Sequence, residues 1–289
     1  MAHADKRPVF RFAPSPNGRL HLGHAYSALF TQAAARHAGG EMLLRIEDID
    51  TVRSREELVD GILEDLDWLG LRYDGEVRRQ SEHFDDYRAA AERLNALGVL
   101  YPCPATRAEI RNAIDEENHP RDPDGSPIYP GLYRGKETSG DNTDHAMRLN
   151  HVLAIQFAMH KYGRIATFTE SLAGPQGETG LVQVRPELWG DVVIVRKDTP
   201  TSYNLSVVVD DALQGVTHVT RGQDLFYATH VHRVLQVLLE LPEPVYCHHK
   251  LINDDTGRKL SKSAGDRSLK SLREAGISAE QIREELGFS

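Results

Sequence analysis

Apolar residues near the start of the chain form short continuous runs that alternate with longer segments of helical spacing. VFRF at residues 9–12 predicts a strand, and MLLRIED at residues 42–48 predicts a second, buried strand. Residues 21–38 predict a helix between them, which ends at Gly39 and Gly40 because glycine readily adopts the backbone conformation that ends a helix. A strand, a helix and a further strand in this order are typical of a parallel sheet.

A second helix is predicted after the second strand. Ser54 and Glu57 have the spacing of a capping box, in which each side chain accepts a hydrogen bond from the other residue's backbone. Leu58, Ile62 and Leu66 then repeat at the helical period. The pattern therefore predicts a helix capped by Ser54.

The same alternation returns in the second half of the chain. DVVIVRK at residues 191–197 and VTHVTR at residues 216–221 predict strands, and residues 225–240 predict a helix. The apolar face of this helix consists of Val231, Leu235 and Leu238. The later segments thus repeat the strand and helix pattern of the first half.

The composition changes between the two halves. Residues 117–145 are rich in proline, glycine, aspartate and asparagine, which favour turns and loops. We therefore predict one α/β domain that is interrupted by a smaller α+β module. Residues 1–97 and 191–289 would form the two halves of the domain, and residues 98–190 would form the inserted module.

Composition excludes several classes of protein. No apolar run approaches the roughly 18 residues of a membrane span, and the N-terminus lacks the apolar stretch of a signal peptide, so we expect a cytoplasmic protein.

Cys103 and Cys247 are too few for a disulfide framework. The formal charge of −9 argues against indiscriminate coating of nucleic acid, so any RNA contact would be local. Since 289 residues can bury a sizeable core, we expect a monomer.

Two histidines, His21 and His24, stand where the first predicted strand gives way to the first helix. Such a junction directs free backbone N–H groups and the positive end of the helix dipole at the sheet edge, where an anion can bind. Gly18 and Gly23 leave room for a phosphate, and the imidazoles could donate hydrogen bonds to its oxygens. Taken alone, the pair could also be two polar residues in a first helical turn.

A second basic element, GRKLSKS at residues 257–263, contains Lys259 and Lys262. Alone it would be an ordinary charged loop. Together with the histidines it predicts a two-sided clamp for a triphosphate, because nucleotidyl transfer needs charge placed against oxygens that become more negative in the transition state. The common nucleotide-binding loops GxxxxGK[ST] and GxGxxG do not occur in the sequence.

These motifs resemble a known family. HLGH and KLSKS are similar to the two signatures of class I aminoacyl-tRNA synthetases, and RFAPSPNGRLHLGH, LRIEDID and VVVDDALQGVTHVTRGQDL are similar to the glutamyl branch. The resemblance implies a Rossmann-type catalytic domain with an inserted acceptor-end module, use of ATP and magnesium, and activation of glutamate to glutamyl-adenylate. It implies ATP-binding residues His21, Gly23, His24 and Lys262, and catalytic residues His21, His24, Lys259 and Lys262.

The resemblance also implies a glutamate pocket, and the charges of its residues complement those of glutamate. Arginines suit the two carboxylates of glutamate, and Arg11 and Arg221 can make bidentate contacts, while Glu47 can face the ammonium group. Either arginine could bind the side-chain carboxylate. The alternative to glutamate binding is that Arg11 and Glu47 form an ion pair with each other. By the family's pattern the glutamate-binding residues are Arg11, Ala13, Ser15, Glu47, Tyr203 and Arg221.

The chain departs from the family at the zinc site that relatives often carry in the insertion. That site has the form Cys-x-Cys followed by Tyr-x-x-x-Cys. Here Cys103 and Tyr129 match, whereas Ala105 and Tyr133 stand where thiolates would be, and His119 is interpreted as a loop residue. One thiolate cannot form a tetrahedral zinc site, so we expect no resident metal.

The end of the sequence bears on the RNA that receives the glutamate. Residues 264–289 follow KLSKS and predict two short helices, the second capped by Ser278 with Gln281, in place of the large anticodon-binding domain of full-length glutamyl enzymes. In this, and in GVTHVTRGQDL, the chain is similar to a shortened branch of the family. That branch transfers glutamate to queuosine, the modified wobble base of tRNA(Asp).

The expected function is therefore ATP-dependent activation of L-glutamate and its transfer to queuosine, with the anticodon stem-loop of tRNA(Asp) as the partner. Three alternatives stay open. The first is a truncated synthetase that charges the 3′ end of tRNA(Glu), the second is a non-catalytic RNA-binding paralogue, and the third is a small nucleotidyltransferase that uses the same histidine motif.

Overall fold

The computed structural model describes residues 7–136, 145–252 and 267–288 of the chain. Within these residues the largest sheet has seven strands. Six of them run parallel to one another, and the seventh, at one edge, runs antiparallel to the strand beside it. The predicted α/β fold with a parallel sheet is confirmed. In spatial order the strands are β3 (Arg78–Arg79), β2 (Glu41–Ile46), β1 (Val9–Phe12), β9 (His218–Gly222), β10 (Val245–His249), β6 (Thr167–Glu170) and β7 (Gly180–Gln183).

Helices pack on both faces of this sheet, because side chains alternate along its strands. Phe10 and Phe12 of β1 belong to one buried cluster, whereas Val9 packs against another. None of the helices in the described segments is long and apolar enough to cross a lipid bilayer. The helices are α1 (Leu22–His37), α2 (Glu56–Trp68), α3 (Phe84–Ala96), α4 (Arg107–Asn112), α5 (His151–Tyr162), α6 (Tyr203–Leu213), α7 (Ala228–Leu239), α8 (Leu269–Glu274) and α9 (Ala279–Glu285).

A second, antiparallel sheet consists of β4 (Leu100–Cys103), β5 (Ala146–Leu149) and β8 (Val193–Val195). Of the two later strands that the sequence predicts, only β9 joins the parallel sheet, whereas β8 pairs with β5. Conversely, β6 and β7 lie within residues 98–190 and extend the main sheet. The division of the chain at residues 98 and 190 therefore stays a prediction.

The first strand, helix and strand follow the sequence pattern closely. Strands β1 and β2 pair in parallel register, and α1 connects them, with His21 as its N-cap and Ala38 as its C-cap. The chain leaves β1 and β9 towards opposite sides of the sheet, because β1 leads to β2 and β9 leads to β10. Ligands of open α/β sheets bind at such a reversal of strand order, beside the carboxyl ends of the strands.

The predicted start of the second helix is wrong. Helix α2 begins at Glu56, and its N-cap is Arg55, whose side chain makes no capping hydrogen bond. Ser54 belongs to the preceding turn, since its backbone N–H donates to the carbonyl oxygen of Asp50 at 2.9 Å. The turn that begins at Asp50 thus contains Ser54, the residue that local spacing had predicted as the helix cap.

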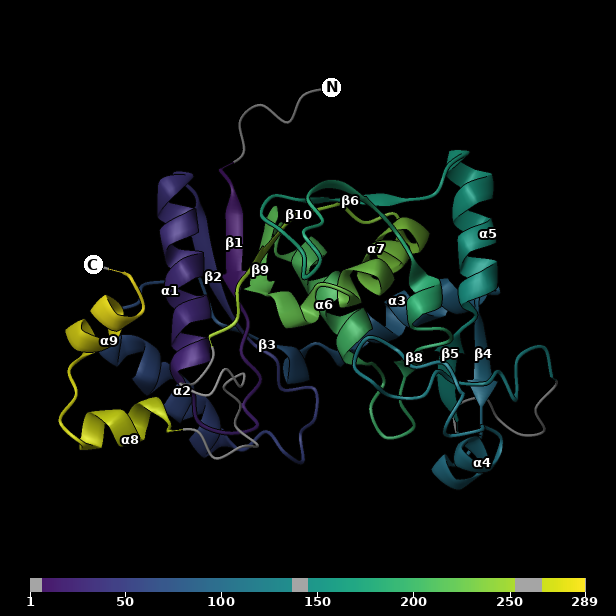
Figure 1. Ribbon diagram of the computed structural model, residues 1–289, viewed down its shortest axis with the longest axis horizontal. Helices are drawn as coiled ribbons and strands as arrows, with labels where there is room; N and C mark the ends of the chain where they lie inside the picture. Colours follow the sequence, from purple (N-terminus) through teal and green to yellow (C-terminus); the bar gives the residue numbers. More distant parts are fainter. Residues whose placement is uncertain (1–6, 137–144, 253–266, 289) are drawn as a thin grey trace.

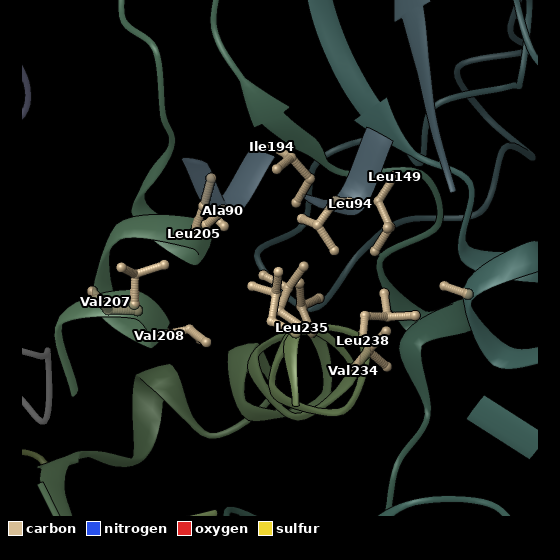
Figure 2. Packing of buried hydrophobic residues seen from close by; sticks show 14 of the residues in the cluster. Ala90, Leu94, Leu149, Ile194, Leu205, Val207, Val208, Val234, Leu235 and Leu238 are labelled. Carbon is tan, nitrogen blue, oxygen red and sulfur yellow. The ribbon is translucent and has the colours of Figure 1, made fainter. Parts of the chain in front are cut away.

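The larger of the two buried clusters surrounds α7. Leu235 and Leu238 face side chains from α3, α6 and the smaller sheet, including Leu94, Leu205 and Ile194 (Figure 2). The predicted apolar face of this helix is therefore confirmed. Because residues of the main sheet, such as Val219, belong to the same cluster, the core continues from one sheet to the other.

The C-terminal helices lie against the N-terminal half of the fold, beside α1 and α2 (Figure 1). Leu269, Leu272 and Ile282 are buried in the cluster that contains Phe10 and Phe12. The predicted capping box of α9 is confirmed, because the Ser278 side chain accepts from Gln281 and the Gln281 side chain accepts in return. The two ends of the described chain therefore share one core.

Candidate active site

An open pocket of about 590 Å³ lies at the carboxyl ends of β1 and β9. It contains both groups of residues that the sequence analysis singled out near the first helix and in the glutamate pocket. Lys259 and Lys262 lie outside the described residues. The predicted site residues that line the pocket are Arg11, Ala13, Ser15, His21, Gly23, His24, Glu47, Tyr203 and Arg221.

The two histidines cap α1. The His21 Nδ1 atom accepts from the backbone N–H of Gly23 at 3.1 Å, and the His24 Nδ1 atom accepts from the backbone N–H of His21 at 3.3 Å. A neutral imidazole that accepts at Nδ1 carries its proton at Nε2. Both rings therefore present an Nε2–H group, which is the form that donates to a phosphate oxygen.

Gly23 is required by the cap itself. A Cβ atom at this position would lie 2.9 Å from the Cε1 atom of His21, closer than such contacts allow. The sequence analysis attributed this glycine to the approach of a phosphate. The structure adds that the glycine makes room for the imidazole that caps the helix.

The cap is joined to the C-terminal helices. The carbonyl oxygen of Leu20 accepts from the backbone N–H of Leu269 at 2.8 Å, and His21 forms an isolated antiparallel bridge with Ser268. Ser268 in turn is the N-cap of α8. The start of α8 therefore supports the backbone from which the two histidines project.

Arg11 belongs to a buried network of charges. Its Nε atom donates to Asp211 at 3.0 Å and its guanidinium also donates to the carbonyl oxygen of Thr220. Arg45 donates to Asp211 at 2.8 Å and lies 3.4 Å from Glu47. The described ion pairs of Glu47 thus involve Arg45 and not Arg11, so the alternative pairing of Arg11 with Glu47 is wrong.

Burial and charge act in opposite directions on the two acids of this network. Burial disfavours the Asp211 carboxylate, but Arg11 and Arg45 together hold its pKa below the usual value. For Glu47 burial prevails over the same two arginines and raises the pKa. A cation beside Glu47, such as the ammonium group of an amino acid, would therefore stabilise its ionised form.

Arg221 has a different environment, although it too is only 5% exposed. Its Nε atom donates to His248 at 3.0 Å, and its terminal nitrogens donate to His232 at 3.2 Å and to Thr229 at 2.7 Å. Burial lowers the pKa of His248 to about 4 and the pKa of His232 well below its usual value, so both are neutral at pH 7. The described hydrogen bonds of Arg221 thus all lead to neutral groups.

Sequence reasoning missed several buried polar residues around this network, among them Asp210, which lies 3.8 Å from Arg45. Asp210 accepts from Arg78 at 2.8 Å, from Gln80 at 2.7 Å and from the hydroxyl of Tyr87. The signal was present in VVVDDALQ, because two adjacent acids after an apolar run are unusual inside a buried helix. The histidines that contact Arg221 carried no comparable signal, since they come from separate segments.

The region where relatives often hold zinc is filled by a small cluster. The thiol of Cys103 donates to the Tyr129 hydroxyl at 3.3 Å, and the backbone N–H of Tyr133 donates to the same oxygen. The guanidinium of Arg148 lies 4.0 Å from the centre of the Tyr129 ring. A single thiol that is hydrogen-bonded to a phenol hydroxyl does not provide the ligands of a tetrahedral zinc site. Within the described residues, no group of three or more His, Cys, Asp or Glu side chains could hold a metal ion.

Comparison with known proteins bears on the chemistry of this pocket. The family model described as class I tRNA synthetases (E and Q), catalytic domain, matches residues 9–287. A glutamyl-Q tRNA(Asp) synthetase of Rhodobacter capsulatus is 46% identical over 97% of this chain and 100% of its own length. One of Geobacter sulfurreducens is 41% identical over 88% of this chain and 75% of its own. A glutamate–tRNA ligase of Aquifex aeolicus is 37% identical over 94% of this chain and 55% of its own.

Solved structures are similar as well. The glutamate-tRNA synthetase of Elizabethkingia anophelis has a TM-score of 0.70 and 27% identity, and the alignment covers 90% of this chain. The chain spans about half of that protein, 53% of its length. A methionyl-tRNA synthetase of Mycobacterium tuberculosis, solved with methionyl-adenylate, has a TM-score of 0.62. Its 16% identity supports the fold alone.

Proposed function

Because this chain belongs to the family of class I tRNA synthetase catalytic domains for glutamate and glutamine, we propose that it activates L-glutamate with ATP and transfers the glutamyl group to queuosine in tRNA(Asp). The relatives named glutamyl-Q tRNA(Asp) synthetase, which align over most of the chain, support this recipient. The observation that carries the proposal is the pocket, which is lined both by the six residues expected to bind glutamate and by the capping histidines.

The first step joins glutamate to AMP. The α-carboxylate of glutamate attacks the α-phosphorus of ATP, and pyrophosphate leaves. His21 and His24 would donate from Nε2 to phosphate oxygens, because their Nδ1 atoms already accept from the backbone. Magnesium, bound with the triphosphate, would neutralise part of its charge. Lys259 and Lys262, outside the described residues, are proposed to approach from the opposite side.

The charge distribution of the pocket favours one arginine for the side-chain carboxylate. The charge of Arg11 is balanced by Asp211, with which it shares a hydrogen bond at 3.0 Å. Arg221 makes its described hydrogen bonds to neutral groups, so its charge remains available to a substrate. We assign the side-chain carboxylate to Arg221 and the ammonium group to Glu47, which lines the same pocket.

The second step forms an ester. A hydroxyl oxygen on the ring of queuosine attacks the glutamyl carbonyl carbon, AMP leaves, and the hydroxyl proton passes to solvent. Within the proposal, the protein acts as a monomer and binds the anticodon stem-loop of tRNA(Asp), so that the wobble base enters the pocket. The division into residues 1–97, 98–190 and 191–289 belongs to the same proposal.

Glutamate-dependent exchange of labelled pyrophosphate into ATP tests the activation step. Glutamine is expected to support exchange roughly 10⁴ times more slowly, because it would leave the charge of Arg221 without a partner. A protein that supports no exchange with glutamate would be a non-catalytic paralogue.

Transfer of labelled glutamate tests the recipient. The substrates are tRNA from cells with queuosine and tRNA from cells that lack it. We expect label on tRNA(Asp) only where queuosine is present. Label on queuosine-free tRNA(Glu), with none on tRNA(Asp), would instead identify a truncated glutamyl-tRNA synthetase.

A further inference from the structure

A buried chain of hydrogen bonds crosses three neighbouring strands at the carboxyl edge of the sheet. Glu170 is the last residue of β6, His248 lies in β10, and Arg221 lies in β9 directly opposite His248. The Oε2 atom of Glu170 lies 2.5 Å from the Nδ1 atom of His248, and the Nε2 atom of His248 accepts from Arg221 at 3.0 Å. Neither the carboxylate nor the imidazole is accessible to solvent.

The proton positions along these hydrogen bonds can be assigned because some of the groups can only donate and others can only accept. Arginine has no acceptor, so the Nε2 atom of His248 must carry a lone pair towards Arg221. The proton of the neutral ring is then at Nδ1, where it is donated to Glu170. Burial disfavours the Glu170 carboxylate, but its interactions with His248 and the hydrogen bond from the Leu172 backbone together lower its pKa, so the carboxylate is ionised. Along this chain of hydrogen bonds Glu170 is therefore negative, His248 neutral and Arg221 positive.

A second histidine repeats the arrangement on the other side of Arg221. His232 accepts from Arg221 at Nδ1, and its Nε2 atom lies 3.0 Å from the side-chain oxygen of Asn204, to which it donates. Thr229 accepts from the third nitrogen. Three of the five N–H groups of the guanidinium are thus directed at fixed acceptors, and none of these acceptors is a carboxylate.

We propose that Glu170 and His248 are positioning residues that hold Arg221 as a fixed cation without a directly bonded carboxylate, and that they thereby set the preference for glutamate over glutamine. This inference rests on the proposed function. If Glu170 touched Arg221 directly, it would neutralise the guanidinium as Asp211 neutralises Arg11. The intervening imidazole keeps the negative charge one ring away from the pocket while it fixes the orientation of the arginine.

The carboxylate is needed because of how its two oxygens are used. The Oε1 atom of Glu170 accepts from the backbone N–H groups of Leu172 at 3.0 Å and of His248 at 3.1 Å. In Glu170→Gln the single amide oxygen would remain with these two donors, and the amide NH₂ would face Nδ1 of His248. The imidazole would then carry its proton at Nε2, where it would oppose the N–H group of Arg221.

The test compares Glu170→Gln with Asp65→Asn in glutamate-dependent pyrophosphate exchange. Asp65 is also fully buried, but it lies on α2, whose apolar residues belong to the other core cluster, so it provides a matched carboxylate-to-amide change. We expect Glu170→Gln to raise the KM for glutamate about 10- to 100-fold, the effect of opposing two buried donors. The ratio of glutamate to glutamine activation should fall by a similar factor.

The KM for ATP should change less than threefold in Glu170→Gln, and Asp65→Asn should leave the KM for glutamate as in the wild type. Equal losses in all parameters, or an unchanged KM for glutamate in folded Glu170→Gln, would show a merely structural role and overturn the inference. A wild-type protein without glutamate-dependent exchange would overturn the proposed function as well, which distinguishes the two failures.

A measurement on the unmodified chain applies if Glu170→Gln does not fold. The ¹⁵N chemical shifts of the His248 ring report which nitrogen carries the proton. At pH 7 we expect a protonated Nδ1 and an unprotonated Nε2. A proton at Nε2, or on both nitrogens, would contradict the arrangement through which Arg221 is held.

Discussion

Individual buried acids differ in how their burial is compensated. Asp211 receives hydrogen bonds from two arginines, and Glu170 from an imidazole and two backbone N–H groups. Asp65 is equally buried, but neither of its oxygens has a hydrogen-bond partner among the described residues. A buried carboxylate without partners disfavours the folded state when it is ionised, so Asp65 should destabilise the protein at neutral pH.

The stability effect of Asp65 should depend on pH. Burial raises its pKa to about 6, against the opposing effect of Arg19 and Arg273, whereas an unfolded aspartate titrates near 4. The unfolded state therefore loses the proton first. The destabilisation is absent below about pH 4, grows between pH 4 and 6, and is complete above pH 6.

Asp65→Asn removes this titration. Relative to the wild type, the free energy of unfolding of this variant should be higher at pH 8 than at pH 4 by about 1–3 kcal/mol, because the destabilisation is absent from the variant. Urea denaturation of both proteins at the two pH values measures the difference. A difference between the proteins that is the same at both pH values would argue against an ionised, uncompensated Asp65.

At the scale of elements, the start of α1 combines a structural and a chemical task. The backbone N–H groups that its capping histidines satisfy are those that every helix leaves open at its N-terminus. Since Nδ1 of each ring accepts in this way, Nε2 carries the proton of the neutral imidazole. The cap therefore fixes the tautomer as well as the position of the two imidazoles.

Gly23→Ala should disturb this cap more than it disturbs the fold. Its Cβ atom would displace the His21 ring, whereas alanine is intrinsically better than glycine in a helix by about 1 kcal/mol. We expect pyrophosphate exchange to fall about 10- to 100-fold, in line with a small misplacement of a catalytic group, while the melting temperature changes little.

Gly61→Ala is the control for this change. Gly61 also lies within a helix, but its Cβ atom would meet only the end of the flexible Arg19 side chain. Exchange should remain near the wild-type rate. Equal rates for the two alanine variants would show that the His21 position is not critical.

The packing of α8 should contribute strongly to stability. Leu269 is fully buried in the cluster of β1, β2 and α1, and Leu269→Ala should lower the unfolding free energy by about 2–5 kcal/mol. Leu213 is 58% exposed, so Leu213→Ala should stay within about 0.5 kcal/mol of the wild type. Urea denaturation measures both. A loss below 1 kcal/mol for Leu269→Ala would mean that α8 is not a firm part of the core.

At the scale of the whole molecule, the structure joins parts that are distant in sequence around one pocket. The N-terminal strand and helix contribute Arg11 and the capping histidines, β9 contributes Arg221, and α6 contributes Tyr203. The C-terminal α8 supports the histidines through the backbone of Leu20. Substitutions far from the pocket in sequence can therefore alter its geometry through the shared core.

The smaller sheet should not need a metal. The cluster of Cys103, Tyr129 and Tyr133 lies where the resemblance to the family implies a zinc site in relatives, and its hydrogen bonds are made by a thiol, a hydroxyl and a backbone N–H group. We expect elemental analysis of the purified protein to find no stoichiometric zinc. We also expect its melting temperature to be unchanged by a strong chelator. One zinc per chain would contradict this expectation.

The sequence by itself determined the features that depend on nearby residues. The first strand and helix, the apolar face of α7 and the capping box of α9 follow from periodicity and cap chemistry over a few residues. The pocket residues were also identifiable, because motifs such as HLGH keep their spacing within one segment.

Tertiary structure decided what depends on contacts between distant segments. The turn at Asp50 moved the start of α2, and pairing with β5 placed β8 in the smaller sheet. Asp211 rather than Glu47 became the partner of Arg11, and Glu170 came to support Arg221 through His248. Such partners are selected by burial and by the need to satisfy each buried charge, and these constraints exist only once the chain has packed.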